Sequence, residues 1–254
     1  MQIKNKKSQL TIFIIISILI IAVVVLFFLF KDNLKIGKPA SPETAEIQNF
    51  VEECLEDTAR SGIYEIGQRG GYYKIPEQNK FSVYGQDYAY YYNGGFISPG
   101  AEIIEKELSE YVLVNLEDCF NFSSFNNRGF EVDYSDYSVY TSILDSEIEV
   151  EMRGLFTIKK NEEIFQINKF LTSFQSDFLN LIKSSEELVI DYSANPEFVC
   201  PSCISDISEK NKVFISSEVF LIPDFEEQVI FFSVDSSEEI FDDKILNLVF
   251  VVRK

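Results

Sequence analysis

The sequence predicts an α+β domain that follows a single membrane-spanning helix. An apolar run without any charge, Leu10 to Phe30, precedes a long acidic region in which apolar residues first recur at helical spacing. Further along the chain the spacing changes to strict alternation, which is typical of strands with one solvated face. We therefore expect helices packed on a mainly antiparallel sheet.

The apolar run is long enough to cross a bilayer. At about 1.5 Å of rise per residue, a helix over residues 10–30 covers roughly 30 Å, the thickness of the hydrocarbon core. The run ends in bulky residues and Lys31-Asp32 instead of a small-residue cleavage site. We therefore expect an uncleaved anchor in the lipid bilayer instead of a secretory signal peptide. The remaining expected segments are a cytoplasmic basic tail at 1–9, a polar linker at 31–41 and an acidic extracytoplasmic domain at 42–254.

The charge distribution predicts which side of the membrane the domain occupies. Lysines flank the apolar run on both sides, so the positive-inside rule alone gives no orientation. All 41 acidic residues lie after the run, and the formal net charge of the chain is −19. An acidic domain is repelled by the anionic cytoplasmic leaflet. We expect a single-pass protein of the cell membrane with its N-terminus inside and its C-terminal domain outside.

The residues around the start of the run, Lys6-Lys7-Ser8-Gln9-Leu10-Thr11-Ile12-Phe13, resemble the processing region of archaeal type IV prepilin-like proteins. The resemblance implies cleavage between Ser8 and Gln9, which would make Gln9 the mature N-terminus. This sequence carries Ser8 where that family usually has glycine, and Phe13 where pilins usually carry a glutamate used in filament assembly. A plain basic flank of a membrane anchor is the alternative interpretation.

Two further segments are similar to uncharacterised membrane-anchored archaeal proteins. The first is Cys54-Leu55 leading to Gly67-Gln68-Arg69-Gly70-Gly71-Tyr72-Tyr73. The second is Ile103-Ile104-Glu105 leading to Leu108-Ser109-Glu110-Tyr111 and Cys119. This similarity implies a shared fold and no known activity.

Two helices are expected in the first half of the domain. Ser41-Pro42 is typical of an N-cap and a first helical position, and the glycines from Gly67 onward end this helix. Ser98-Pro99 is expected to begin the second helix, which continues to Phe120. Between the two, the tyrosine-rich stretch from Tyr72 to Gly95 predicts a hairpin-like pair of strands. The apolar stripes of the two helices are Ile47, Phe50, Val51, Cys54, Leu55 and Ala59, and Ile104, Leu108, Tyr111, Val112, Leu116 and Cys119.

Strands are expected in most of the second half. Ile148, Val150 and Met152 alternate with glutamates, which predicts a strand with one solvated face. Similar patterns predict strands at 137–144, 155–159, 162–167, 212–222, 227–234 and 245–252. One helix is expected to interrupt them, because Phe170, Leu171, Phe174, Phe178, Leu181 and Ile182 recur at helical spacing. Ser184–Glu187 and Ser236–Asp243 are expected to be loops.

Composition excludes several classes of function. The chain has no histidine, which removes Ser-His-Asp and Cys-His catalysis and histidine-ligated metals. It has no phosphate-binding glycine motif. Nucleic-acid binding requires a basic surface, and a net charge of −19 argues against one. No cofactor or metal is expected.

The first pair of cysteines lies on the two helical stripes. If the helices pack together, the sulfurs of Cys54 and Cys119 meet, and in an oxidising compartment they form a disulfide. The alternative is two buried unpaired thiols.

Cys200-Pro201-Ser202-Cys203 is the sharpest local motif of the chain, and three interpretations compete. The favoured one is a local disulfide that fixes a loop. The second is a redox-active dithiol, with residues 188–192 as the preceding strand and Pro223 as a cis-proline candidate; the acidic neighbours Glu197, Asp206 and Glu209 disfavour the thiolate that such a site needs. The third is half of a zinc site, for which a second pair of cysteines is lacking.

Three surface features have both a structural and a functional interpretation. The tyrosines are expected to be half-buried strand residues, with a surface for glycan or polymer as the alternative; they are Tyr72, Tyr73, Tyr84, Tyr88, Tyr90, Tyr91 and Tyr92. The acidic clusters are expected to be solvated instead of calcium-binding; they are Asp133/Asp136, Asp145/Glu147 and Glu238/Glu239/Asp242/Asp243. Asn121-Phe122-Ser123 is a glycosylation sequon, which requires exposure outside the cell.

These observations favour a non-enzymatic envelope protein with a role in surface structure, adhesion or assembly, of which a pilin-like subunit is a variant. Its expected partners are the bilayer and other envelope or pilus-like proteins. The alternative is a membrane-tethered thiol–disulfide oxidoreductase that uses Cys200 and Cys203.

Overall fold

The computed structural model describes residues 42–196, 199–222, 227–241 and 243–253. The expected tail, anchor and linker over residues 1–41 lie outside the described residues, as do Glu197, Pro223 and Asp242. Among the described helices, none combines the length and the apolar character needed to cross a membrane. Residues 46–254 form one compact unit, and the contacts given below lie within it.

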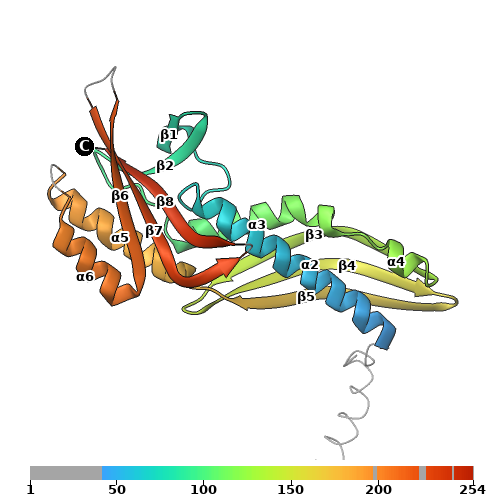
Figure 1. Cartoon of the computed structure of the whole chain (residues 1–254). Coiled ribbons are helices and arrows are strands. Elements are labelled where there is room, and N and C mark those ends of the chain that lie inside the picture. Colours follow the sequence, from blue (N-terminus) through green and yellow to red (C-terminus); the bar gives the residue numbers. More distant parts are fainter. Residues whose placement is uncertain (1–41, 197–198, 223–226, 242, 254) are drawn as a thin grey trace, which may run out of the picture. The chain divides into compact units, whose positions relative to one another are not determined.

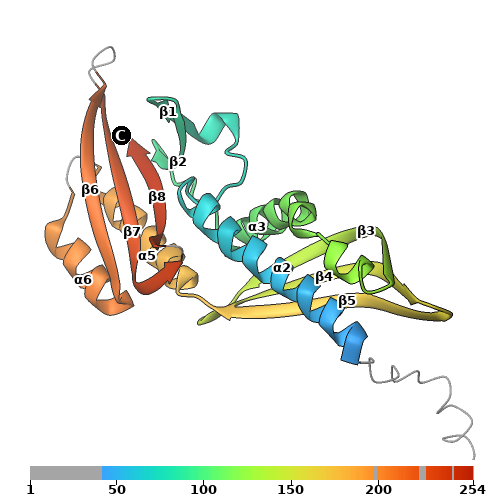
Figure 2. The same ribbon diagram turned by 45° about the vertical axis from the view of Figure 1, so that its right-hand side comes forward.

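The strands form two sheets (Figures 1 and 2). The larger sheet has the order β1-β2-β8-β7-β6, and the smaller has the order β3-β4-β5. All neighbours pair antiparallel except β2 and β8, which run parallel. The α+β class with mainly antiparallel pairing is therefore confirmed. The strands are β1 Lys80–Val83, β2 Gln86–Asn93, β3 Phe130–Ile143, β4 Glu147–Lys160, β5 Glu163–Gln175, β6 Val213–Ile222, β7 Glu227–Phe241 and β8 Lys244–Arg253.

Two of the expected helices are present close to their predicted bounds. α2 covers Pro42–Gly67, and α3 covers Ala101–Asn115 with a short 3₁₀ turn, η2 Leu116–Cys119, behind it. The predicted stripe of α2 is buried, with Ile47, Val51 and Leu55 fully removed from solvent. The helices approach closely at Gly62, where an added Cβ would lie 2.6 Å from the ring of Tyr111. Burial of these facing apolar stripes stabilises the contact between α2 and α3.

The predicted helix through Phe170 and Phe174 is wrong, because these residues belong to strand β5. Residues four positions apart lie on one face of a helix and also on one face of a strand, so their spacing suits both structures. The helix begins at Phe178 instead: α5 covers Phe178–Ala194. It includes the predicted loop Ser184–Glu187 and residues 188–192, the candidate strand of the redox interpretation. Ser184 and Ser185 are fully buried, and their hydroxyls donate to the carbonyl oxygens of Asn180 and Leu181 at 2.7 and 2.8 Å.

Three other elements differ from expectation. β4 is one strand that joins the predicted segments 147–152 and 155–159, and β3 begins seven residues before the predicted 137. β7 extends through Phe241, so most of the predicted loop Ser236–Asp243 is strand. Two small helices were not anticipated: α4 Ser123–Asn126, and α6 Pro201–Asn211, which follows the Cys-Pro-Ser-Cys motif. Short or polar helices lack the apolar stripe that reveals α2 and α3.

Glu239 of β7 holds the start of α5. Its carboxylate accepts a hydrogen bond from the backbone N–H of Asp177, the N-cap of α5, at 2.8 Å. Burial raises the pKa of the Glu239 carboxyl, and the neighbouring Asp177 carboxylate raises it further, while this hydrogen bond and the positive charge of Arg60 lower it. The net direction is upward, so ionised Glu239 is less favourable in the folded chain than in the unfolded one.

This shift predicts how stability depends on pH. A carboxyl whose folded pKa is raised destabilises the protein as pH rises from its ordinary value, about 4.3, through the raised value. We expect Glu239→Gln to raise the urea midpoint at pH 7 and to lose this advantage at pH 4. Urea unfolding at both pH values measures the effect, with Glu238→Gln on the exposed neighbouring position as the control. Equal midpoints for Glu239→Gln and the unaltered protein at pH 7 would contradict the assignment.

Candidate functional site

The loop that follows α2 has positive φ angles at two positions, a backbone conformation for which glycine is strongly preferred. Gly70 and Gly71 have φ values of 63° and 80°, a region that side-chain-bearing residues avoid. A Cβ at Gly71 would also lie 2.7 Å from Ile104 of α3. The backbone N–H of Gly71 donates to the Ile66 carbonyl at 2.7 Å, which closes the end of α2. The loop is thus fixed against α3, and Arg69 and Tyr73 take defined positions.

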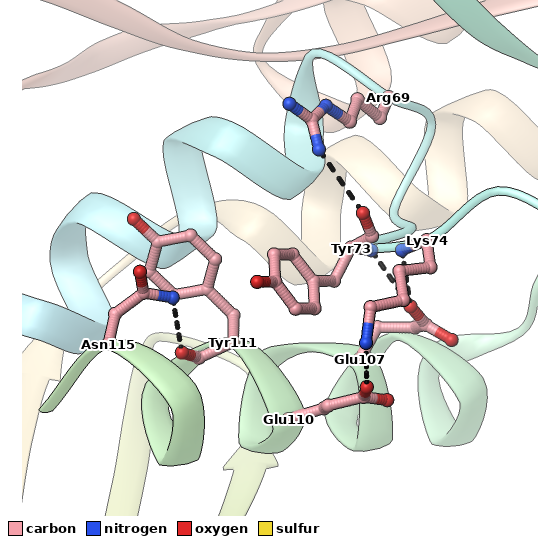
Figure 3. A network of polar contacts seen from close by, with 7 residues as sticks. All are labelled: Arg69, Tyr73, Lys74, Glu107, Glu110, Tyr111 and Asn115. Atoms are coloured by element: carbon pink, nitrogen blue, oxygen red, sulfur yellow. Dashed lines mark hydrogen bonds and ion pairs between the residues drawn. The ribbon is translucent and has the colours of Figure 1, made fainter.

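A polar network ties the loop to α3 (Figure 3). One carboxylate oxygen of Glu107 accepts the backbone N–H groups of Tyr73 and Lys74 at 2.8 and 3.1 Å. The Lys74 ammonium donates to Glu110 at 2.6 Å, and this hydrogen bond raises the pKa of Lys74. The guanidinium of Arg69 donates to the Tyr73 carbonyl at 3.2 Å. The edge-to-face contact of Tyr73 with Tyr111, at 5.4 Å between ring centroids, completes the attachment.

A polar pocket of about 580 Å³ opens beside this network. It lies between the end of α2, the loop and the β1–β2 hairpin, and its walls carry both charges and amides. Lys80 is paired with Glu77 at 2.7 Å, and Arg69 with Glu65 at 3.8 Å, so the positive charges are offset locally. The lining residues are Glu65, Gln68, Arg69, Tyr73, Lys74, Ile75, Glu77, Lys80, Gly85, Gln86, Asp87 and Tyr88.

Next to the polar pocket, at the same hairpin, lies a groove of about 470 Å³, here called the aromatic groove. Gln86 and Tyr88 line both this groove and the polar pocket. Aromatic rings form part of its wall, with Tyr88 and Phe220 each edge-to-face against Phe231 at 4.9 and 5.0 Å. The remaining walls include hydroxyls and a carboxylate; the full lining is Val83, Tyr84, Gln86, Tyr88, Ser216, Ser217, Glu218, Phe220, Phe231, Phe232, Ser233 and Val249.

The tyrosines of the predicted hairpin do not share one environment. On strand β2, Tyr90 and Tyr91 are buried and Tyr88 and Tyr92 are partly buried, as expected for strand residues. Tyr72 is buried and Tyr73 partly buried, but both lie in the loop before β1, so the strand prediction is wrong for them. Tyr84 is 92% exposed at the tip of the hairpin. The sequence predicted a hairpin for the tyrosines from Tyr84 to Tyr92 correctly. Phe220 and Phe231 come from distant strands and were not recognised as part of a site.

The sulfurs of Cys54 and Cys119 lie 2.00 Å apart as a disulfide. Cys54 is buried on the stripe of α2, and Cys119 ends the 3₁₀ turn that follows α3. This bond joins residues 65 positions apart, so it closes a long loop covalently.

Cys200 and Cys203 also form a disulfide, at the start of α6. Cys200 is the N-cap of α6, and its sulfur accepts the backbone N–H of Cys203 at 3.2 Å. The ligand atoms of Asp191, Cys200 and Cys203 lie within 4.8 Å of one another. A void of about 10 Å³ beside them has room for about one water molecule. The bonded sulfurs do not offer the thiolates that a zinc site requires.

The described residues of the acidic clusters and the glycosylation sequon that the sequence offered as candidate sites do not form part of the pocket or the groove. Within the described parts of the chain, Asp191, Cys200 and Cys203 form the one cluster of three potential metal ligands, so the acidic clusters do not assemble there. Asp133 pairs with Lys159 at 3.0 Å, and Asp145 with Lys183 at 3.1 Å. Asn121 of the sequon is exposed, and its side-chain oxygen accepts the backbone N–H of Ser123 at 3.2 Å.

Neither a protein-family model nor a curated protein matches this chain.

Proposed function

We propose that this chain is a single-pass membrane-anchored protein whose acidic domain lies outside the cell and has a non-enzymatic role in envelope structure, adhesion or assembly. The apolar run at residues 10–30 supports the anchor. Residues 1–9 are the cytoplasmic tail in this proposal. A pilin-like subunit processed to begin at Gln9 is a variant of the same function.

The observation that carries the proposal is the state of the cysteines. All four pair within bonding distance, and among the described residues none is free. Disulfides persist in oxidising compartments and are rare in the cytosol of most cells. Export of the domain best explains a chain that has two disulfides after an apolar run long enough to span a membrane.

The open polar character of the pocket supports binding over catalysis. Each of its positive charges is paired with a carboxylate, and its wall lacks histidine because the chain has none. A recognition surface needs only complementary shape and hydrogen-bonding groups.

A thiol–disulfide oxidoreductase is the second candidate, and one observation favours it. The sulfur of Cys200 lies at the N-terminus of α6, where the helix dipole stabilises a thiolate. Asp191 lies beside both sulfurs and offers a proton acceptor. Against it, the exposed Asp206 on α6 adds negative charge near the site, and α5 precedes the motif instead of a strand.

Thiol trapping followed by mass spectrometry tests the proposal on protein taken directly from cells. We expect both disulfides intact and resistant to mild reductant, and the domain accessible to protease added to whole cells. A fast-reacting, partly reduced Cys200–Cys203 pair would favour the oxidoreductase, and Cys203→Ser would then trap mixed disulfides with partners. Four reduced cysteines and a protected domain would overturn export. The N-terminal peptide in the same spectrum shows whether the mature chain begins at Gln9.

A further inference from the structure

The tip of the β1–β2 hairpin holds an aromatic side chain at a position that favours small residues. Val83 pairs with Gln86, so Tyr84 and Gly85 form a two-residue turn. Their φ values are 51° and 80°, which match a type I′ turn, where Asn-Gly is the preferred sequence. A tyrosine in this left-handed region is disfavoured. Because Tyr84 is 92% exposed, burial of its ring contributes almost nothing to the stability of the fold.

The ring of Tyr84 belongs to the wall of the aromatic groove. Tyr84 and its neighbour Val83 line the aromatic groove, together with Tyr88, Phe220 and Phe231. Three serines and Gln86 also line this groove, so its wall contains aromatic rings together with hydroxyl and amide groups. A wall of this kind suits a ligand that has both C–H faces and many hydroxyls.

The charges beside the hairpin argue for a neutral ligand. In the adjoining polar pocket, Lys80 faces Glu77 and Asp87, and Lys74 faces Glu110. In the groove, Glu218 is the charged lining residue. The chain as a whole carries a formal charge of −19, so an anionic polymer would be repelled. The groove and the pocket thus offer many hydrogen-bond donors and acceptors, and their positive charges are offset by carboxylates. This lining fits a neutral molecule with many hydroxyl groups.

We propose that the aromatic groove and the adjoining polar pocket bind a neutral glycan, with Tyr84 as the ring on which a sugar stacks. The C–H face of a sugar ring packs on an aromatic face, while its hydroxyls bind the serines, Gln86 and the paired charges of the pocket. This binding activity rests on the proposed function, because export places the domain at the cell exterior, where it encounters glycans. An apolar peptide strand is the less suitable occupant, because Ser216, Ser217 and Ser233 would lose their hydration against it.

Replacement of Tyr84 by asparagine separates binding from folding. Tyr84→Asn restores the preferred turn sequence, so it should raise the thermal midpoint of the protein while it removes the ring. We expect the affinity for a neutral oligosaccharide to fall about five- to tenfold, the size of one lost ring contact. If this variant binds more weakly although it is more stable than its parent, misfolding cannot be the cause.

The experiment uses the full chain purified in a polyoxyethylene detergent, because sugar-based detergents would compete for the groove. Immobilised neutral hexose oligosaccharides, in α- and β-linked series, are the probes, and heparin is the anionic comparator. The dissociation constant for the neutral oligosaccharide with the strongest signal is then measured by titration calorimetry. Tyr140→Ala is the matched control, because this tyrosine is 52% exposed but lies on β3 of the other sheet.

Binding of a neutral oligosaccharide that Tyr84→Asn weakens and Tyr140→Ala leaves unchanged would support the proposal. Binding of heparin alone, binding of no probe, or equal affinity of Tyr84→Asn and its parent would overturn it. The measurement on purified protein does not depend on membrane orientation. Absence of glycan binding therefore does not contradict export, which the thiol and protease experiment tests. Likewise, evidence against export would not contradict glycan binding measured on the purified protein.

Discussion

Replacing both Cys54 and Cys119 by alanine is expected to lower the free energy of unfolding by about 4 kcal/mol, because the bond restricts a long loop in the unfolded chain. The two residues are 65 positions apart, and in the loop-entropy model the stabilisation grows with loop length. Cys54 is also buried between α2 and its neighbours, so the loss of its sulfur adds a small packing defect. A loss of this size is a large part of the stability of a typical domain.

Urea unfolding of the full chain, followed by far-UV circular dichroism, measures this loss. The matched control is the double variant Cys200→Ala with Cys203→Ala, whose residues are only three positions apart. The same model assigns that short loop about 2 kcal/mol, so the first variant should unfold at clearly lower urea. Equal losses for the two variants would show that loop length does not govern the effect.

Gly67→Ala is the second change with a large expected effect, a loss of about 3 kcal/mol. An added Cβ would lie 2.2 Å from the backbone carbonyl oxygen of Asn247 in β8. A backbone atom within a sheet cannot rotate away as a side chain can, so the end of α2 must move off β8. That displacement would also disturb the loop that carries Arg69 and Tyr73, and with it the polar pocket.

Thermal and urea unfolding of Gly67→Ala provide the measurement. Gly95→Ala is its control, because a Cβ there meets no atom within 4 Å, and it should change the free energy of unfolding by less than about 0.5 kcal/mol. A midpoint for Gly67→Ala equal to that of Gly95→Ala would mean that α2 and β8 are not in close contact at this point.

The helices α2 and α3 could be predicted because their burial is local in sequence. Ile47, Val51 and Leu55 recur on one face, and proline and glycine mark the two ends. Strand β5 could not be separated from a helix, because the interval between Phe170 and Phe174 suits both periods. The buried serines of α5 were also misleading: a polar residue satisfied by a carbonyl of its own helix looks like a loop residue in sequence.

The candidate site depends on contacts between distant segments, which the sequence does not reveal. The Tyr84-Gly85 turn could have been predicted from sequence, since a glycine between two short strands is a hairpin signal. Phe220 and Phe231 belong to β6 and β7, and only the sheet order β1-β2-β8-β7-β6 brings them into one groove with the hairpin. That order requires the parallel pairing of β2 with β8, and no local pattern encodes such long-range pairing.

The Cys54–Cys119 bond has a mechanical consequence. Every residue that lines the polar pocket, from Glu65 to Tyr88, lies in the segment between these two cysteines, and so does the hairpin that carries Tyr84. When tension is applied between the two ends of the chain, the covalent path passes through the sulfurs and bypasses this segment. The pulled chain can lengthen only by extending residues outside the closed loop, so the pocket and Tyr84 stay off the path that bears load until the bond is reduced.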